Sequence, residues 1–555
     1  MRYISGMLVA MVMVVATTTL SAQEHKRVEV TKNYMHEVSP AEKIVAPTDI
    51  NDAPVIEPEI EYNVSPETWQ IKLEDHNFNP ASASYWDESR SQRLFMRLAA
   101  GVPLATDVAV RYATHTTRLG YFGVGVDHDA NLARKCNGYG DEVSVADSYS
   151  MTNSIDVIGG VMAGRQMFEA SVDYTSDIVN RYAMQSPDRI YFHDANMRLR
   201  YGDDFTNLSR FNFGVEAAAG YWREHLPFEE SVLRVGEVNA VACASLARDF
   251  KGNILRLDAG FGLWKGDKYT NYQDMAANIA FSYYRKIGVM SLKAEMQYMY
   301  DKVNGRDKAS HFFMPAVKLD FDFGKSGIRP YVEFATNVTH NGIESLYVQN
   351  RFVAFVPMMS YFNGMASTCS YDLHLGFAGS DRASKVAYRL YIGGSYILNH
   401  VFWYVNQIGT FGFAQENNAR LFAGAEIEYH PVGGLKLAAS VRGPLDKTNT
   451  EYAVSDPKFV ASGVAEYRLK RWLFSVGADY IGKRTWSGVA AGDIVITESF
   501  HAPVAIDLHA EIAFVATSRV ELFVKGCNLL DKQIYDYAYY YRNGIGAMAG
   551  LKIDF

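Results

Sequence analysis

The chain ends in a segment in which apolar and polar positions alternate. One face of residues 545–555 is apolar, with Ala547, Ala549, Leu551, Ile553 and Phe555. The other face is mostly polar or small, with Met548, Gly550, Lys552 and Asp554. A period of two predicts a β-strand. A closed transmembrane barrel needs such a last strand to pair with its first strand. Taken alone, the segment fits the last strand of a soluble antiparallel sheet equally well.

The same alternation recurs from Arg93 onward. It is clearest in residues 94–98, 107–112, 211–221, 255–263, 292–301, 317–323 and 504–514. Many of these segments reach about ten residues, the length of a tilted strand that crosses a bilayer, whereas strands in soluble proteins average about five or six. Their polar faces carry charged side chains, which a water-filled or protein-filled lumen tolerates. The pattern therefore predicts an all-β fold in which residues 93–555 form a large antiparallel transmembrane β-barrel.

The connections between these segments alternate in length toward the C-terminus. Short turns are expected at residues 164–166, 251–253, 324–327, 431–434 and 518–519, and long polar connections at 127–149, 444–456, 483–501 and 531–543. Outer-membrane barrels have short periplasmic turns and longer surface loops, and the segments here add up to about 20 to 24 strands. The alternation fails between residues 345 and 370, where the sequence predicts no strand.

The first 92 residues follow a different pattern. Arg2, an apolar run over residues 7–16 and a small, polar exit ending at Ala22 are typical of a secretory signal peptide, which we assign to residues 1–22. No later run approaches the roughly 18 apolar residues that a membrane helix needs. Residues 23–92 are rich in proline, with Pro40, Pro47, Pro54, Pro58, Pro66 and Pro80. This composition predicts an extended, mostly irregular arm in the periplasm or the lumen.

Composition and charge limit the kinds of partner and the cellular locations that fit this chain. The formal net charge of −8 lacks the excess of positive charge that is typical of nucleic-acid-binding proteins. The 36 tyrosines suit a membrane interface, where one end of the side chain is wet and the other is apolar. Together with the signal peptide, these features predict a protein of the cell outer membrane of a Gram-negative bacterium, in contact with outer-membrane lipid.

Residues 502–555 resemble a known family. The segment Val520 to Tyr535 contains Asn-Leu-Leu-Asp-Lys at residues 528–532, followed by the aromatic Tyr535. It is similar to the penultimate barrel strand of TonB-dependent outer-membrane receptors, and a tyrosine-rich loop and a closing strand ending in Phe555 follow, as in that family. The family's Pro-Gly-Arg step is replaced here by Arg542-Asn543-Gly544. The resemblance implies a barrel of about 22 strands.

The chain departs from this family at its N-terminus. TonB-dependent receptors carry a folded plug domain inside the barrel, whereas only the proline-rich arm precedes the first strand here. The short piece Val28 to Thr31 is similar to the segment that pairs with TonB or opens the plug. We expect the arm to lie in or across the periplasmic mouth, or else to hang in the periplasm and dock another protein. In the first case acidic residues of the arm would meet basic residues of the lumen: Glu57, Glu59 and Glu61 on one side, Arg97, Arg111 and Lys293 on the other.

No pattern for catalysis or cofactor binding stands out. The motifs of serine hydrolases, zinc proteases and P-loop proteins are missing, so we predict no enzyme, no catalytic residue, no cofactor and no metal. An acidic loop that could bind Ca²⁺ through Asp127, Asp129, Asp141 and Glu142 is better interpreted as a solvated surface loop. Gly123 and Gly125 are interpreted as small residues of the barrel wall. Cys243 and Cys527 are expected in strands, whereas Cys136 and Cys369 lie in or beside loops and could pair.

Two function classes remain open. One is transport, in which a receptor-like barrel binds a nutrient or takes it up across the outer membrane. The other is a plugless structural or assembly barrel that anchors partner proteins. The partner would be a periplasmic energy-coupling protein or a surface lipoprotein. Charged residues expected in the lumen could line a permeation path or contact the arm: Arg256, Asp258, Lys293, Glu295, Asp507 and Glu511. The sequence does not name a substrate.

Overall fold

The computed structural model describes residues 93–555 except for 115–119, 226–234, 268–271, 325–326, 355–364, 381–384, 446–454, 492–493 and 496. The predicted signal peptide and arm lie outside the described residues. The described part is all-β, with the short helices α3 (Val145–Ser148) and α4 (Ile343–Gln349). Among the described residues no helix is long and apolar enough to cross a membrane.

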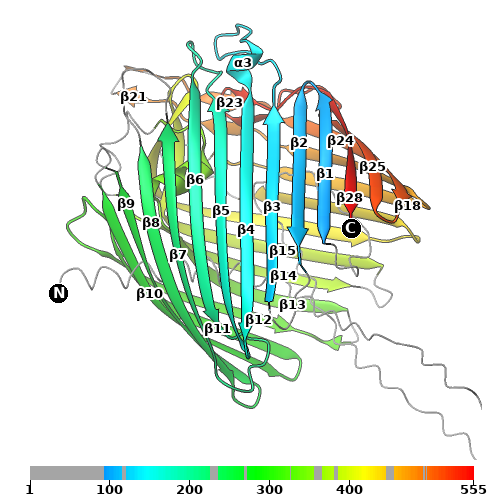
Figure 1. The fold of residues 1–555 in the computed structure, drawn as a ribbon. Coiled ribbons are helices and arrows are strands. Elements are labelled where there is room, and N and C mark those ends of the chain that lie inside the picture. Colours follow the sequence, from blue (N-terminus) through cyan, green and yellow to red (C-terminus); the bar gives the residue numbers. More distant parts are fainter. Residues whose placement is uncertain are drawn as a thin grey trace, which may run out of the picture. The chain divides into compact units, whose positions relative to one another are not determined.

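A single sheet of 22 antiparallel strands makes up the barrel (Figure 1). The first and last strands pair over eight positions, from Phe95 opposite Asp554 to Val102 opposite Ala547, so the sheet has no open edge. The strands are β1 (Leu94–Val102), β2 (Ala105–Ala113), β3 (Gly120–Asn131), β4 (Ser150–Ala163), β5 (Gln166–Asn180), β6 (Arg189–Gly202), β7 (Asn212–His225), β8 (Gly236–Asp249), β9 (Asn253–Gly266), β10 (Gln273–Ile287), β11 (Met290–Lys302), β12 (Ser310–Phe321), β13 (Ile328–Thr339), β14 (Thr368–Ser380), β15 (Val386–Gln407), β16 (Thr410–Tyr429), β17 (Leu435–Pro444), β18 (Val460–Leu469), β19 (Trp472–Ile481), β24 (Ala505–Thr517), β25 (Val520–Cys527) and β28 (Gly546–Asp554).

The alternation in the sequence separates the two faces of this wall. Leu246, Leu257, Phe281 and Met296 form one cross-strand row, and each is between 41 and 49% exposed. They belong to an outward apolar face suited to lipid. Residues one position away point inward, as Asp258 does in β9, where only 2% of its surface is exposed. The predicted fold class and strand pattern are confirmed.

The two edges of the barrel differ in their connections. One edge carries short turns such as 164–165, 288–289, 470–471 and 518–519. The other edge carries the long segments 132–149, 340–367, 482–504 and 528–545. We call the second edge the outer edge, because surface loops of outer-membrane barrels are longer than their periplasmic turns. α3 lies at this edge (Figure 1).

The sequence motif at the end of β25 builds a local turn at the outer edge. Asn528 has a positive φ of 45°, a conformation that asparagine tolerates better than most residues. Its side-chain amide donates hydrogen bonds to the carbonyl oxygens of Lys532 (2.7 Å) and Asn543 (2.8 Å). The Asn-Leu-Leu-Asp-Lys stretch thereby fixes where β25 ends and where the tyrosine-rich loop returns to β28.

Candidate functional site: a loop cap inside the outer mouth

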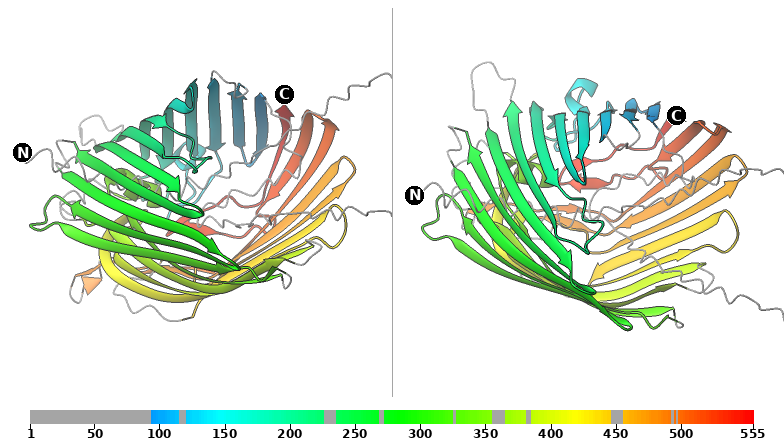
Figure 2. Two further views of the ribbon diagram at one scale, coloured as in Figure 1. Left: turned by 90° about the horizontal axis from the view of Figure 1, so that it is seen from below. Right: turned by 60° about the horizontal axis from the view of Figure 1, so that its bottom comes forward.

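The long segments at the outer edge fold over the mouth and into the barrel. We call them the loop cap, defined as residues 132–149, 181–188, 340–354, 482–491 and 528–545, together with the ends of β15 and β16 around residues 400–414. Seen along the barrel, elements of these segments lie within the ring of strands (Figure 2). Buried aromatic residues from the loop cap and from the inner face of the wall form one continuous cluster. The main apolar core of the described residues therefore lies at the outer mouth.

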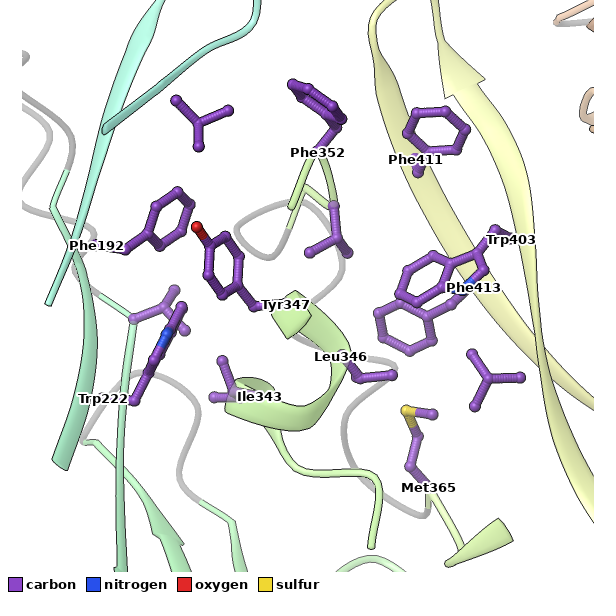
Figure 3. Packing of buried hydrophobic residues seen from close by; sticks show 14 of the residues in the cluster. Phe192, Trp222, Ile343, Leu346, Tyr347, Phe352, Met365, Trp403, Phe411 and Phe413 are labelled. Carbon is purple, nitrogen blue, oxygen red and sulfur yellow. The ribbon is translucent and has the colours of Figure 1, made fainter. Parts of the chain in front are cut away.

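Helix α4 bridges two sides of the barrel interior. Figure 3 shows it between Phe192 and Trp222 on one side and Trp403 and Phe413 of the β15–β16 hairpin on the other. The ring of Tyr347 lies 3.9 Å from that of Phe192 and 5.4 Å from that of Trp222, measured between centroids. Ile343 and Leu346 on the same helix are fully buried. Aromatic contacts of this kind add about 0.5–1.5 kcal/mol each beyond the burial of surface.

Buried polar groups of the wall hold α4 in place. The carboxylate of Glu237 accepts a hydrogen bond from the backbone N–H of Ile343 at 2.6 Å and another from the Tyr272 hydroxyl. The Tyr347 hydroxyl donates to Asp177 of β5, and Asn239 of β8 donates to Glu344 at 2.8 Å. The backbone donors at the start of a helix have no partner within it, so Glu237 satisfies a group that burial would otherwise leave unpaired.

The electrostatics around α4 follow from burial. Burial, and after it the nearby carboxylates Asp194 and Glu237, raise the pKa of Glu344 from 4.5 to about 8. Burial also lowers the pKa of His340, which precedes α4, to about 3. The His340 ring stacks on Trp264 at a centroid distance of 3.9 Å. At neutral pH both side chains are therefore uncharged in the folded cap.

The remaining segments of the cap are fastened to one another. Phe352 stacks on Tyr540 at 3.5 Å between centroids, and the Tyr540 hydroxyl donates to the carbonyl oxygen of Gly409 at 2.6 Å. The Val405 N–H donates to the carbonyl oxygen of Ser487 at 2.8 Å. These contacts link the segment after α4, the β15–β16 hairpin and the two last loops into one body.

The β15–β16 hairpin reaches the cap because its strands are unusually long, at 22 and 20 residues. Its register shifts between Ile397 and His400, where Asn399 has a positive φ of 53°. A bulge of this kind bends a hairpin and increases its twist. The residues beyond it, Trp403 and Phe411 among them, are buried.

A buried lysine joins the first loop to the last. Lys135 is 4% exposed, and its ammonium donates to the carbonyl oxygen of Tyr541 at 3.0 Å. The same ammonium lies 4.7 Å from the centre of the Tyr541 ring. Burial lowers the pKa of Lys135 to about 8. The backbone N–H of Tyr541 in turn donates to the Tyr182 hydroxyl at 3.0 Å.

The charged residues predicted for the lumen point inward and are paired along the wall. Arg256 meets Asp258 at 2.8 Å, and Lys293 lies 3.9 Å from Glu295. Asp507 meets Arg542 of the last loop at 3.0 Å, and Glu511 meets Lys552 at 3.3 Å. Both signs of charge alternate on the inner wall, so its field does not select one sign strongly. The six residues do not converge on a single binding point.

The basic residues proposed to meet the arm also have partners in the wall. Arg97 pairs with Asp107 at 2.8 Å, and Arg111 pairs with Asp127 at 3.1 Å. The acidic residues Glu57, Glu59 and Glu61 lie outside the described residues. Contact between the arm and the lumen therefore stays a prediction.

The acidic residues considered for Ca²⁺ do not form one site. Asp127 and Asp129 lie on the inner face of β3, and Asp127 is bound to Arg111. Glu142 lies in the loop that follows β3 and pairs with Arg134 at 2.9 Å. Within the described ranges no group of three or more His, Cys, Asp or Glu side chains is placed to hold a metal ion. Gly125 is a small wall residue as predicted, since a Cβ there would come 2.2 Å from the Asp156 carboxylate.

The cysteines are all free in the structure. Cys243 and Cys527 lie in β8 and β25, where strands were predicted. Cys136 is exposed in the first loop of the cap, whereas Cys369 is fully buried at the start of β14. The disulfide considered between Cys136 and Cys369 is therefore not formed.

Sequence reasoning missed the residues that build the cap. Residues 345–370 gave no strand pattern, and the structure shows why, because α4 and its flanking segments fold into the lumen there. The sequence pattern gave no role to Phe192 and Trp222, although they form the platform for Tyr347. One signal in the sequence could have located the cap. The long connection at residues 340–367 contains several large apolar residues, which is unusual for an exposed loop.

Comparisons with known proteins show which proteins share this barrel architecture. No protein-family model matches the sequence, and no curated protein is similar to it in sequence. Solved structures do match. The copper transporter OprC has a TM-score of 0.64 at 12% identity, covering 83% of this chain and 80% of its own. The FrpB iron transporter from Neisseria meningitidis (F3-3 variant) has a TM-score of 0.64 at 11% identity, covering 83% and 81%. The chain has the barrel fold of TonB-dependent outer-membrane receptors.

A third similar structure is the ferric enterobactin receptor PfeA from Pseudomonas aeruginosa, with a TM-score of 0.64 at 9% identity and coverage of 83% and 81%. At such low identities these matches establish a shared fold. They confirm the resemblance inferred from residues 502–555 and the expected strand count. The expected lack of a full plug domain concerns residues outside the described part and stays a prediction.

Proposed function

We propose that this protein is an outer-membrane barrel that binds a nutrient and takes it up, with the loop cap as the barrier on its path. The observation that carries the proposal is the closed 22-strand barrel with a charged inner wall and an aromatic cap inside its outer mouth. A wide lumen would otherwise let solutes cross freely. Closure by side-chain contacts, rather than by covalent bonds, is the kind of barrier that can open.

The similar structures suggest which nutrients to test first. They are named as a copper transporter, an iron transporter and a ferric enterobactin receptor. We therefore propose metal ions and metal chelates as the first class of substrate. We further propose that opening of the cap is driven by a periplasmic energy-coupling protein or by a surface lipoprotein that delivers the substrate.

Uptake in whole cells tests this proposal. A strain lacking the chain and the same strain complemented with the full chain are given radiolabelled ferric enterobactin or copper. The proposal expects uptake of at least one probe to fall in the deletion strain and to return on complementation. Unchanged uptake of both probes, with loss of other proteins from the outer membrane, would instead favour the role of an assembly barrel.

A further inference from the structure

The outer surface of β6 and β7 carries a basic patch near the outer edge. On β6 the outward positions are Arg189, Tyr191 and His193, and on β7 they are Arg223 and His225. His193 is directly opposite Arg223 in the ladder, and Tyr191 is opposite His225. We call Arg189, His193, Arg223 and His225 the outer basic patch.

The direction of these side chains follows from their neighbours. On the same face, toward the middle of the strands, Tyr221 is 43% exposed and Met197 is 46% exposed. The intervening residues Phe192 and Trp222 are buried in the cap cluster on the inner face. The outer basic patch is therefore separated from the lumen by the wall.

The patch lies at the boundary of the apolar band. The cross-strand row immediately below it contains Ile155, Tyr174, Tyr221 and Val238, all exposed and all apolar or aromatic. Tyrosines near the ends of the strands are typical of the level at which lipid headgroups begin. Beyond this row, on the side of the surface loops, His193 and Arg223 form the first outward pair, His225 belongs to the second, and Arg189 is the third outward position of β6.

Among the described residues, the arginines of the patch contact neutral groups. In the described part of the chain neither Arg189 nor Arg223 forms an ion pair. Arg189 donates to the carbonyl oxygen of Ala146 at 2.8 Å and lies over the ring of Tyr149 at 4.6 Å. Asp147 acts on Arg189 only at longer range, and its carboxylate is bound by Ser144. Arg223 donates to the Tyr221 hydroxyl at 3.3 Å.

Arginines that face outward at the edge of the apolar band attract anionic lipid headgroups. A phosphate suits this arrangement, because guanidinium groups bind phosphate through paired, charge-assisted hydrogen bonds. We propose that the outer basic patch binds the phosphates of phosphorylated lipid in the outer leaflet, with Arg189 and Arg223 each as the main ligand of one phosphate group. The tyrosines beside them contact the lipid where its headgroup meets its chains. This site is separate from the proposed transport path.

Lipid retention by the folded full chain tests the proposal. The protein is purified in detergent, given lipid A, and examined by native mass spectrometry. R189Q/R223Q is compared with R198Q/R200Q, which removes two arginines from the inner face of the same strand. Folding of each variant is checked by the heat-modifiable shift on gels. We expect the R189Q/R223Q variant to lose about tenfold or more in lipid binding, as two basic contacts with an anionic lipid would predict.

The control variant should bind lipid A within about twofold of the wild type, because its arginines face the lumen. Lipid A without its phosphates should bind the wild type as weakly as lipid A binds R189Q/R223Q. Equal retention of lipid A by both variants and the wild type would overturn the proposal. So would displacement of bound lipid by inorganic phosphate at equal concentration, since the site would then bind free phosphate. Cross-linking of residues 189 and 223 to an acidic protein in cells, with no change in lipid retention, would overturn it as well.

Discussion

Replacing Tyr347 by alanine should loosen α4 without unfolding the barrel. The side chain is 9% exposed, packs on Phe192 and Trp222, and donates a hydrogen bond to Asp177. Removal of a large buried aromatic side chain costs about 3–5 kcal/mol. The loss falls on a short helix that is held mainly by such contacts, so it should appear as local opening of the cap.

The expected size can be expressed as hydrogen exchange. A local cost of about 3 kcal/mol corresponds to an increase of roughly 150-fold in the open population. Exchange at the amides of Leu346 in α4 and of Asn350, which follows α4 and donates to the carbonyl oxygen of Leu346, should therefore quicken by about 10² or more in Tyr347→Ala. Tyr347→Phe keeps the ring and loses one hydrogen bond, and Asp177 keeps a bond from Thr152 at 2.7 Å. It should cost only about 1 kcal/mol, or roughly fivefold in exchange.

Exchange measured by mass spectrometry on the folded protein in detergent provides the assay. Val348→Ala is the matched control, because Val348 lies on the same helix and is 74% exposed. Exchange in the barrel strands should stay unchanged in all three variants. The reasoning fails if α4 exchanges at the same rate in Tyr347→Ala as in Val348→Ala.

Three further predictions concern the wall, its closure and pH. Ile512 is 48% exposed on the outward face of β24, so Ile512→Arg should destabilise the barrel by about 2–4 kcal/mol near the bilayer midplane. Ser475→Arg, across the ladder from Glu466 and Glu511, should cost much less. Equal unfolding midpoints of the two variants in urea would show that the two faces of the wall are wrongly assigned. Phe555 joins the last strand to the first, because its N–H donates to the carbonyl oxygen of Leu94 at 2.9 Å. Deleting Phe555 should therefore lower the amount of the heat-modifiable folded form in outer membranes. Unchanged insertion of the shortened chain would refute this role of Phe555. The pKa of Glu344 is raised from 4.5 to about 8, so protection of α4 amides should be greatest below about pH 4.5 and should decline as the pH rises toward about 8. Glu344→Gln should weaken that decline, and a decline of unchanged size in the variant would exclude Glu344 as a cause.

The wall of the barrel could be predicted from the sequence because each strand carries its own evidence. The alternation of apolar and polar residues assigns Leu257 to the outward face and Asp258 to the inward face, and the same alternation holds in every strand. The turn at Asn528 could be located because its motif acts locally through its own backbone and neighbours. These local signals predicted about 20 to 24 strands and the antiparallel closure, and the family resemblance narrowed the count to about 22.

The loop cap could not be predicted in the same way. Tyr347 meets Phe192, and Phe352 meets Tyr540, across large separations in sequence. The sequence around one residue of such a pair does not indicate which distant residue it contacts, because loop segments lack the regular alternation that fixes the register of strands. Whether Cys136 pairs with Cys369 stayed open for the same reason, since proximity to a loop says nothing about the depth at which each residue is buried.

The most direct test of the central claim is the conductance of single barrels in planar bilayers. The account holds that the loop cap closes the outer mouth, so the wild type and Val348→Ala should pass little current. Phe352→Ala combined with Tyr540→Ala breaks the stacking between two segments of the cap and should produce large conductance steps. Each protein is also measured with residues 23–85 deleted, which separates the cap from the predicted arm. If the arm-deleted wild type conducts as well as the arm-deleted double variant, the cap is not the barrier and the account is wrong.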